Sequence, residues 1–550
     1  MSHPAAEASG VQEAPSAAPP VSGRPGRAFA LTLFLAFLAI GGWSLATPLF
    51  AAPDEPVHVI KAAAVVRGEL VGKLLGGSTS PLGIVSVPDF YATTRNIPAC
   101  YHRRPTVPAS CAPRPSGSAG TRQVVIYNAR YPPLYYSIVG LPSLLGVGEV
   151  ELYLMRLVSA LLSSAFVALA VATAVAWSRH RVVVVGVVVA TTPMVLFLGG
   201  VVNPAGLETS AAIATWTAGS VLVFEHLEDP PAGLVGALGL SACVLELSRP
   251  ISPFWLALTA LALVAVAERR SLRAFVAHRR VQVGLAVVFL VGVAATAWIL
   301  RERSFDVYST TPVGRSVSES RILETSFLHN DFYLPGMIGV FGWFDTYSPT
   351  FTYVVWYGLV GLLALAGAVV GRLRDALTLL VVTVAIVVVP VAISTSQVHR
   401  YGFTWAGKDT LPFAVGLPIL AAALAGRSAL AERRGRLAGV VALAAFLAQV
   451  AAFYEMLRRY AVGTAGSDFG FLEHWSWQPP IGLGGALGLE VPALALLAVA
   501  AYLVVRPGGR VGDQRGVGRA ASGASSGRLA APGRARSSVS AALARGGAGG

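Results

Sequence analysis

Charged side chains are scarce in this chain of 550 residues, because Asp, Glu, Lys and Arg together make up only 13% of it. Soluble globular proteins carry about a quarter of their residues as charged side chains. Hydrophobic residues account for 54%, and the mean hydropathy is +0.64. These values exclude an ordinary soluble domain and predict an integral membrane protein.

Lysine is scarcer still, since it occurs only at Lys61, Lys73 and Lys408 and every other basic residue is arginine. A GC-rich genome accounts for most of these arginines. The formal net charge of +14 does not form a basic stripe. The arginines lie in short loops between apolar runs and in the C-terminal tail, where they indicate topology. We therefore expect no nucleic-acid partner.

Cysteine occurs only three times. Cys100 and Cys111 lie in one long polar loop, whereas Cys243 lies within an apolar run. A Cys100–Cys111 disulfide is expected if that loop faces an oxidising exterior. Cys243 is expected to pack as a small hydrophobic residue.

Several familiar signatures are also missing. The polar loops contain no Walker loop, dinucleotide fingerprint, zinc-ligand spacing or G-x-S-x-G elbow, which argues against nucleotide-driven chemistry. No A-x-A-like cleavage site ends the first apolar run, which is long enough to span a membrane. We therefore expect a first membrane span rather than a cleavable signal peptide.

What the chain does contain is about twelve apolar runs. They cover residues 28–50, 151–177, 182–199, 207–224, 233–247, 251–267, 281–300, 351–371, 376–393, 411–425, 437–454 and 483–505. If the N-terminus lies inside, nearly all inner loops carry arginine, as the positive-inside rule requires. The sequence therefore predicts an all-α polytopic protein of about twelve transmembrane helices in a bacterial plasma membrane, with both termini cytoplasmic.

Three segments follow from this pattern. Residues 1–27 form a disordered cytoplasmic N-terminus, 28–505 the transmembrane domain, and 506–550 a disordered basic cytoplasmic tail. The first extracytoplasmic loop, 51–150, is too long for a plain connector and is expected to be structured. It would hold a helix from Pro56 and an interfacial helix from Pro133 to about Val147, with tyrosine rings at headgroup level.

An acidic stretch, residues 52–58, directly follows the first span. Asp54, Glu55 and His58 are costly next to hydrocarbon unless they are solvated or paired. One interpretation is an acid/base centre at the membrane surface. In the other, Asp54 is the N-cap of a helix that begins at Pro56, and the charges mark where the first span ends. His58 and Lys61 would share a face of that helix.

Two further polar sites precede apolar runs. Asn203 and Glu208 open one of them, where Glu208 is either an electrostatic cap or a second carboxylate facing the same cavity as Asp54. Arg249 lies between two runs, where a lone guanidinium is costly without an anion. A phosphate is its natural partner, and interfacial snorkelling is the alternative.

The last candidates lie in two later loops. Trp343 and Asp345 belong either to a site or to an aromatic belt and a helix cap. His399 and Arg400 precede the pair Lys408 and Asp409. That pair is either a surface ion pair or aims its ammonium group at a lipid phosphate.

Four motifs together resemble a family of bacterial multi-pass membrane proteins of unknown function, over residues 30–505. They are Pro53-Asp54-Glu55-Pro56-x-His58, Tyr131-Pro132-Pro133-Leu134-Tyr135-Tyr136, Asn203-Pro204-x-Gly206-x-Glu208 and Gly342-Trp343-x-Asp345. More distantly, the layout is similar to GT-C glycosyltransferases of the protein mannosyltransferase and lipid A aminoarabinose transferase types. In place of their Gln-Gly-Arg-Tyr-x-x-Pro-like motif this chain has a lysine, Lys408, which keeps the charge without the bidentate fork of arginine.

This resemblance implies a GT-C-like membrane glycosyltransferase that moves a sugar from a polyprenyl-phosphate donor to a glycan or lipid acceptor on the outer face. Arg249 and Lys408 would hold the phosphate, and Asp54 or Glu55 would act as general base. Glu208 would orient the acceptor or help bind a divalent metal ion, the only cofactor considered. The remaining expected substrate-binding residues are His58, Tyr131, Tyr135, Asn203, Trp343, Asp345, His399, Arg400 and Asp409.

Two other functions stay open. A transporter or flippase of lipid-linked glycans would show inverted repeats and charged or broken helices near mid-membrane. The sequence shows no convincing internal repeat, and its charges lie at the outer ends of the apolar runs. A non-catalytic membrane protein of envelope assembly would tolerate the loss of Asp54, Glu55 and Glu208 together.

Overall fold

Long apolar helices dominate the computed structural model, which describes residues 24–75, 82–225, 227, 229–306, 312–314, 316–427 and 434–506. Within those ranges nine helical segments are long and apolar enough to cross a membrane. They are α1 (Pro25–Ala46), α5 (Glu149–Trp177), α8 (Pro204–Phe224), α12 (Arg279–Glu302), α15 (Thr350–Val370), α16 (Leu373–Tyr401), the run α17 (Gly407–Ala414) plus α18 (Gly416–Ala425), α19 (Arg434–Val462) and α20 (Gly482–Val505). Two shorter apolar helices, α9 (Ala232–Ser248) and α10 (Ser252–Val266), accompany them.

The remaining predicted span, 182–199, is broken into α6 (Val183–Ala190) and α7 (Pro193–Gly199). Thr192 is extended at the break, because a residue before proline is driven out of the helical region. Polar groups of the two threonines at the break form hydrogen bonds with other helices. The Thr192 hydroxyl donates to the Met337 carbonyl at 2.8 Å, and Gln449 Nε2 donates to the Thr191 carbonyl at 2.8 Å. With this pair, every one of the twelve predicted apolar runs is helical, and the predicted fold class is confirmed.

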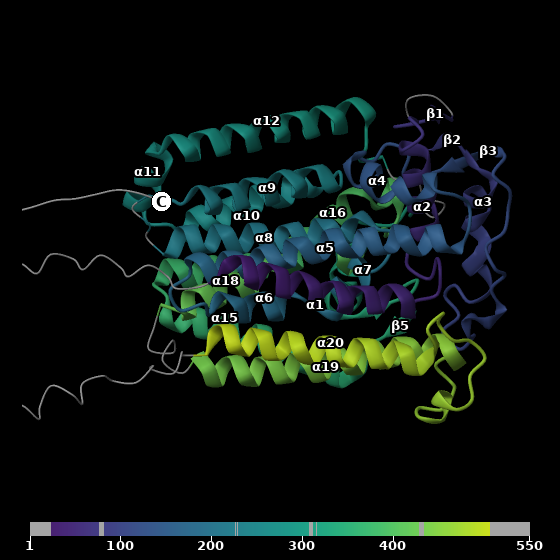
Figure 1. Ribbon diagram of the computed structural model, residues 1–550. Helices are drawn as coiled ribbons and strands as arrows, with labels where there is room; N and C mark the ends of the chain where they lie inside the picture. Colours follow the sequence, from purple (N-terminus) through teal and green to yellow (C-terminus); the bar gives the residue numbers. More distant parts are fainter. Residues whose placement is uncertain are drawn as a thin grey trace, which may run out of the picture. The chain divides into compact units, whose positions relative to one another are not determined.

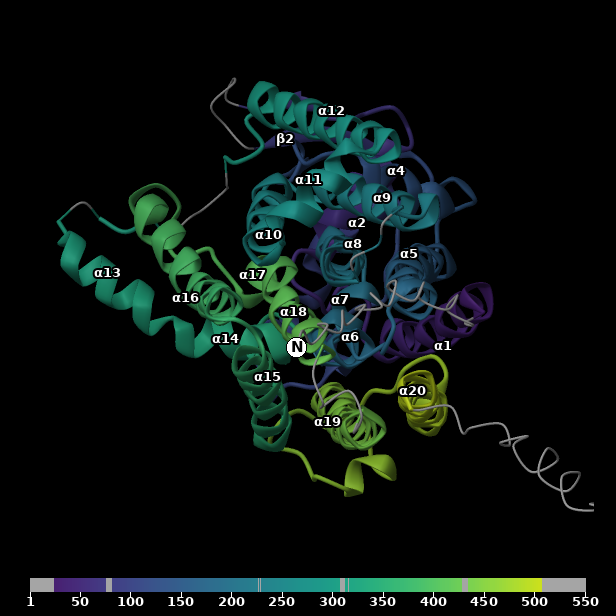
Figure 2. The same ribbon diagram turned by 90° about the vertical axis from the view of Figure 1, so that its left-hand side faces the viewer.

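Helix α8 lies at the centre of the helix bundle, which Figure 2 shows end-on. It packs against α5, α9, α18, α7 and α10. Of its most apolar stretch of 18 residues, 89% is buried. Its sequence is rich in Ala, Gly, Ser and Thr, and such small residues let neighbouring helices approach closely. At Gly206 the neighbouring backbone is so close that an added Cβ would lie 2.4 Å from the carbonyl oxygen of Leu198.

Replacing Gly206 with alanine should therefore destabilise the bundle, although alanine is the better helix former. The obstructing atom is a backbone oxygen that no side-chain rotation can move, so we expect a cost of about 1–3 kcal/mol, visible as a lower thermal unfolding midpoint. The matched control is Gly488→Ala on α20, where an added Cβ meets nothing within 4 Å. Equal unfolding midpoints for the two variants would contradict this packing.

The described residues between α1 and α5, 47–75 and 82–148, form a structured unit that we call the cap (Figure 1). It contains α2 (Glu55–Val65), α3 (Asp89–Ala92), α4 (Leu134–Val139) and the strands β1 (Lys73–Leu74), β2 (Gly83–Pro88) and β3 (Thr121–Ile126). The strands form one antiparallel sheet in the order β1-β2-β3, with Gly83 opposite Ile126. The expected Cys100–Cys111 disulfide is present. The first long loop is thus structured, as predicted.

The interfacial helix expected after Pro133 differs from the prediction. Helix α4 ends at Val139 and is followed by a short 3-10 turn, Leu141–Leu144. Tyr135 and Tyr136 are fully buried, so their rings do not lie at a membrane surface. Their hydroxyls instead bond to Ser159 of α5 and to His58 of α2. The tyrosines therefore attach α4 to its neighbours.

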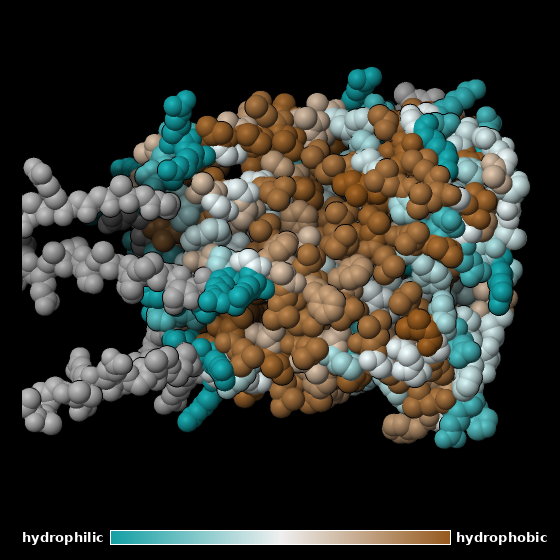
Figure 3. Space-filling model, in the orientation of Figure 1, coloured by the Kyte–Doolittle hydropathy of each residue, from teal (hydrophilic) through white to brown (hydrophobic). Residues whose placement is uncertain are grey.

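Five further elements connect the spans: α11 (Arg269–Ala277), α13 (Glu319–Leu328), α14 (Asn330–Ile338) and the paired strands β4 (Val340–Phe341) and β5 (Thr346–Tyr347). The end of the bundle opposite the cap, where α1 begins and α20 ends, is called the far end. Figure 3 shows hydrophobic side chains over the helices and hydrophilic ones toward both ends. The predicted tails fall largely on residues 1–23 and 507–550, which lie outside the described residues.

Candidate functional site

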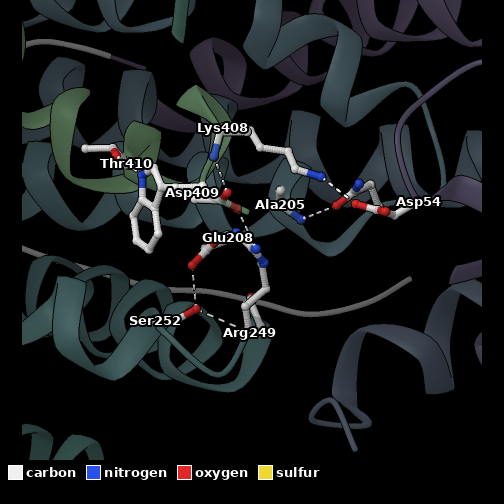
Figure 4. A network of polar contacts seen from close by, with 12 residues as sticks. Asp54, Ala205, Glu208, Arg249, Ser252, Lys408, Asp409 and Thr410 are labelled. Carbon is white, nitrogen blue, oxygen red and sulfur yellow. Dashed lines mark hydrogen bonds and ion pairs between the residues drawn. The ribbon is translucent and has the colours of Figure 1, made fainter. Parts of the chain in front are cut away.

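Five charged residues from four separate segments form one network at the cap end of the bundle (Figure 4). Lys408 Nζ donates to Asp54 Oδ2 at 2.8 Å. Arg249 donates to Asp409 Oδ1 at 2.7 Å and to Glu208 Oε2 at 3.0 Å. Lys408 and Asp409 are consecutive in the first turn of α17, so this turn joins the two halves. The predicted meeting of Asp54, Glu208, Arg249 and Lys408 is therefore observed, and we call the five residues the charge network.

Asp54 occupies the N-cap position of α2, but its side chain makes no capping hydrogen bond. Asp54 is therefore the N-cap by position, as one interpretation held, but its side chain does not cap the helix. The carboxylate turns away from the helix and accepts hydrogen bonds from Lys408 at 2.8 Å and from the Tyr127 hydroxyl at 2.6 Å. Its backbone has φ 65°, a left-handed conformation that Asp and Asn tolerate better than most residues. The side chain is 35% exposed, the largest exposure in the charge network.

The pKa of Asp54 lies well below its ordinary value. Burial is the largest single influence and would raise this pKa, but the Lys408 ammonium group, the neighbouring His58 and the Tyr127 hydroxyl together lower it by more. The carboxylate is therefore ionised and able to accept a proton, while its basicity is held down by the lysine. Any change that removed Lys408 from Asp54 would raise the pKa of Asp54.

Lys408 and Asp409 do not pair with each other, so the expected surface ion pair is wrong. Lys408 is 8% exposed at its side chain and lies over the Phe344 ring, 5.6 Å from its centroid. Asp409 uses its second oxygen to accept the backbone N–H of Ala406 at 3.0 Å. One carboxylate thus begins α17 and also binds Arg249.

Glu208 is fully buried and has both oxygens engaged. Arg249 binds one of them, and the Ser252 hydroxyl donates to the other at 2.7 Å. These partners replace the expected electrostatic capping of α8. Arg249 is likewise held between two carboxylates rather than extended toward the membrane surface, so the snorkelling interpretation is also wrong.

Asn203 connects the charge network to the cap. Its side-chain oxygen accepts the Ala205 N–H at 3.0 Å and caps α8, while its amide donates to the Pro53 carbonyl at 3.2 Å. The residue before Asp54 is therefore fixed to the start of the helix that carries Glu208. This contact sets the relative position of the two carboxylates.

The charge network does not fit a metal ion. Within the described part of the chain, no group of three or more His, Cys, Asp and Glu residues is placed to hold one. Both oxygens of Glu208 already bind Arg249 and Ser252, and both oxygens of Asp54 also have partners.

Glu55 has a different environment from Asp54, although the sequence suggested the same role for both. It is 1% exposed and binds Arg156 of α5 through two hydrogen bonds, of 2.7 and 2.6 Å. Its Oε1 also accepts the Val202 N–H at 3.1 Å. A carboxylate fully enclosed by a guanidinium is a poor general base, so the geometry assigns Glu55 a positioning role at the start of α2.

Arg156 is the most important residue that the sequence interpretation overlooked. Besides Glu55, its guanidinium donates to the carbonyls of Ser44, Thr47 and Pro48, where α1 ends. It therefore fixes the end of α1 to α2. The signal was present, because an arginine inside a predicted span indicates a buried partner. Tyr127 and Ser252 were also missed, and no pattern in the sequence distinguishes them from other polar residues.

His58 lies beside the charge network without joining it. Its Nδ1 is 2.8 Å from the Tyr136 hydroxyl and 3.0 Å from Asn128 Nδ2. The Tyr131 ring lies 6.2 Å from the His58 ring, centroid to centroid. Burial raises the pKa of Tyr131, while Arg249 lowers it and Asp54 raises it, so this phenol lies in the field of the charge network.

Burial lowers the pKa of His58 from 6.5 to about 3; Asp54 opposes this change, and Lys408 and Arg249 add to it. The folded protein therefore keeps His58 neutral where the unfolded chain takes up a proton. Stability should fall as pH drops from 6.5 toward 3, by about 2 kcal/mol at pH 5 from this group alone.

The measurement is the unfolding midpoint at pH 7.5 and at pH 5 for the wild type and for His58→Gln, whose amide oxygen can still accept the Tyr136 proton. The wild type should lose more stability on acidification than the variant. Because every other histidine is common to both proteins, equal losses would show that His58 is not the group responsible.

The other predicted site residues lie in separate clusters. Asp345 binds Arg459 of α19 at 3.0 Å, and Trp343 donates to the Phe50 carbonyl at 3.2 Å. Asp345 does not cap α15, whose N-cap is Pro349, so that alternative is wrong.

His399 and Arg400 lie at the end of α16. Arg400 binds Asp306 at 3.1 Å, and His399 lies 3.4 Å from Glu319. None of these residues contacts the charge network, so the structure does not bring them together with Asp54 as the sequence suggested.

Solved structures that are similar to this chain include one protein in two states, apo and bound to undecaprenyl phosphate. Both are ArnT from Cupriavidus metallidurans, with 15% sequence identity and a TM-score of 0.40. The matches cover 87% of this chain and 76% and 75% of the ArnT chains. No curated protein matches the chain. The family model of DUF2142, described as a predicted membrane protein, matches residues 37–407, more than half of the length. The chain therefore belongs to the DUF2142 family of predicted membrane proteins.

Proposed function

We propose that this protein is a membrane glycosyltransferase that moves a sugar from a polyprenyl-phosphate donor to a hydroxyl of a cell-envelope acceptor. Transfer would occur at the cap end, on the outer face of a bacterial plasma membrane, with both termini in the cytoplasm. The observation that carries the proposal is the charge network. In this network the Lys408 ammonium group contacts the ionised, partly exposed carboxylate of Asp54. The Arg249 guanidinium binds Asp409, the residue that follows Lys408.

The donor phosphate would bind Lys408 first. Arg249 already binds two carboxylates, so an incoming phosphate would have to displace Asp409 or Glu208 from it. Lys408 is engaged by a single carboxylate, that of Asp54, and the anionic phosphodiester of a polyprenyl-phosphate sugar can compete with that carboxylate for the ammonium group. Arg249 would act at longer range, by holding Asp409 and thereby the first turn of α17.

When the Lys408 ammonium group leaves Asp54 and binds the donor phosphate, Asp54 would become a better base. The ammonium group is the main cause of the low pKa of Asp54, so its withdrawal raises that pKa and makes the carboxylate a better base. Asp54 then takes the proton of the acceptor hydroxyl. The acceptor oxygen attacks the anomeric carbon, the bond from this carbon to the phosphate oxygen breaks, and polyprenyl phosphate leaves with the electron pair. Tyr127 keeps the carboxylate oriented throughout.

Replacing Lys408 with methionine tests the phosphate-binding step. We expect affinity for a long-chain polyprenyl phosphate to fall by about tenfold or more, because the lost contact is a charge-assisted hydrogen bond of roughly 1.5–3 kcal/mol. Binding can be measured by native mass spectrometry of the detergent-solubilised protein. The control is Lys73→Met, which removes an exposed lysine of β1 in the cap. Unchanged affinity in Lys408→Met would argue against the proposed donor site.

One observation favours a transporter of lipid-linked glycans as the second candidate. The break between α6 and α7 interrupts a membrane-spanning run, as broken helices do in transporters. Proteoliposomes with a fluorescent polyprenyl-phosphate sugar in one leaflet distinguish the two functions. A transporter would equilibrate the lipid between leaflets without breaking its sugar–phosphate bond, and Asp54→Asn would not abolish this movement.

A further inference from the structure

Helix α12 lies at the edge of the bundle and packs mainly along α9 (Figures 1 and 2). Only 11% of its most apolar stretch of 18 residues is buried. A groove of about 800 Å³ runs between the two helices. It is lined by Ala232, Val235, Gly236, Gly239, Leu240 and Cys243 of α9 and by Arg279, Arg280, Val283, Gly284 and Val287 of α12.

The groove is open because its walls carry few side-chain atoms. A Cβ added at Gly236 or Gly239 would meet nothing within 4 Å. Along α9 the groove extends from Ala232 to Cys243, roughly 16 Å at the helical rise of about 1.5 Å per residue. One leaflet of a bilayer core is about 15 Å thick, so the groove is as long as one extended acyl chain inside one leaflet.

The two ends of the groove are chemically different. At the end facing the charge network, Glu246 of α9 lies against Gly292 of α12, and a Cβ added at Gly292 would lie 2.8 Å from the glutamate Oε1. At the far end, Arg279 and Arg280 line the opening. Arg280 also lies 3.3 Å from Asp229.

Helix α11 precedes this opening and adds positive charge to the same end. It carries Arg269, Arg270 and Arg273, has no buried residue, and carries Leu272 just before Arg273 and Phe275 just after it. Such a basic amphipathic helix is suited to lie at an anionic membrane surface. The far end of the groove therefore combines an apolar slot with an excess of guanidinium groups.

We propose that the groove binds one anionic glycerophospholipid from the leaflet at the far end. One acyl chain would occupy the space between α9 and α12, and the phosphate would contact Arg279 and Arg280. The apolar slot selects a lipid tail and the arginines select a negative headgroup, so a zwitterionic lipid should bind less tightly. The site lies at the opposite end of the bundle from the charge network and does not depend on the proposed transferase activity.

Filling the groove tests the acyl-chain part of the site. In native mass spectrometry of the full-length protein, wild type should retain one phosphatidylglycerol molecule about fivefold more tightly than phosphatidylcholine. Gly236→Leu/Gly239→Leu should weaken retention of phosphatidylglycerol by at least about tenfold, because the leucines occupy the slot. Leucine is a better helix former than glycine, so the fold should survive.

The matched control is Gly358→Leu/Gly361→Leu on α15, where an added Cβ also meets nothing within 4 Å and which contributes none of the residues that line the groove. This variant should bind phosphatidylglycerol as the wild type does. Equal binding by both double variants would overturn the proposal, and so would equal retention of the two lipids by the wild type.

The headgroup part is tested by Arg279→Gln, which should reduce affinity for phosphatidylglycerol about fivefold and affinity for phosphatidylcholine by less, because only the first lipid has a net negative headgroup. Its control is Arg436→Gln, an exposed arginine in the first turn of α19. If Arg436→Gln weakened binding as much as Arg279→Gln, the effect would be general surface charge, and the assigned headgroup contact would be wrong.

Discussion

Asp54→Asn should lower the rate of sugar transfer by about two to four orders of magnitude, the usual contribution of a general base. Asparagine tolerates the left-handed backbone at position 54, and its amide oxygen can still accept the hydrogen bond from Lys408 while its NH2 group faces the Tyr127 hydroxyl oxygen. It cannot take up a proton from an acceptor hydroxyl. The loss should therefore appear in the rate, with little change in the unfolding midpoint.

The measurement is release of polyprenyl phosphate from a synthetic polyprenyl-phosphate sugar by protein in nanodiscs, together with the envelope glycan of cells that carry the variant. Asp89→Asn is the control, because Asp89 is another carboxylate of the cap and its ion pair with Arg122 lies at the surface. Transfer at the wild-type rate by Asp54→Asn would rule out the proposed base and would favour a non-catalytic protein.

Arg156→Met should give the largest loss of stability, about 3–5 kcal/mol in the free energy of unfolding. The substitution leaves Glu55 buried without its cation and also removes the donor to three carbonyls at the end of α1. Breaking one partner of a buried pair is costly because the other charge stays desolvated. The change can be followed as the thermal unfolding midpoint in detergent.

Two further variants separate the buried charge from a general effect of losing an arginine. Arg122→Met removes a 59% exposed arginine from a surface pair in the cap and should cost less than about 1 kcal/mol. The double variant Glu55→Gln/Arg156→Met should be more stable than Arg156→Met alone, because no unpaired charge remains buried. If Arg156→Met were as stable as Arg122→Met, the pair would not hold α1 and α2 together.

The transmembrane part of the fold was predictable from the sequence because hydrocarbon leaves the backbone few options. Each long apolar run had to be helical, and only the break at Thr192 required the local effect of Pro193. In the cap, the helix after Asp54 and the Cys100–Cys111 disulfide were predictable, but the sheet was not, because its strands are short and pair across the chain.

The members of the charge network were predictable, but their partners were not. Asp54, Glu208, Arg249 and Lys408 stood out because charge at the end of an apolar run is costly alone. Which residues pair depends on helix rotation. Lys408 and Asp409 are neighbours in sequence, yet successive helical residues point in different directions, so each binds a different partner. The same rotation separates Glu55 from Asp54.

The left-handed backbone of Asp54 has a consequence for how this position can change. A side chain in that conformation costs roughly 1–2 kcal/mol, a penalty that glycine would not incur. A library of variants selected for heat resistance alone should therefore accumulate glycine at position 54. The same library selected for growth that requires an intact envelope should keep aspartate at position 54. The two selections would therefore give different residues at this position.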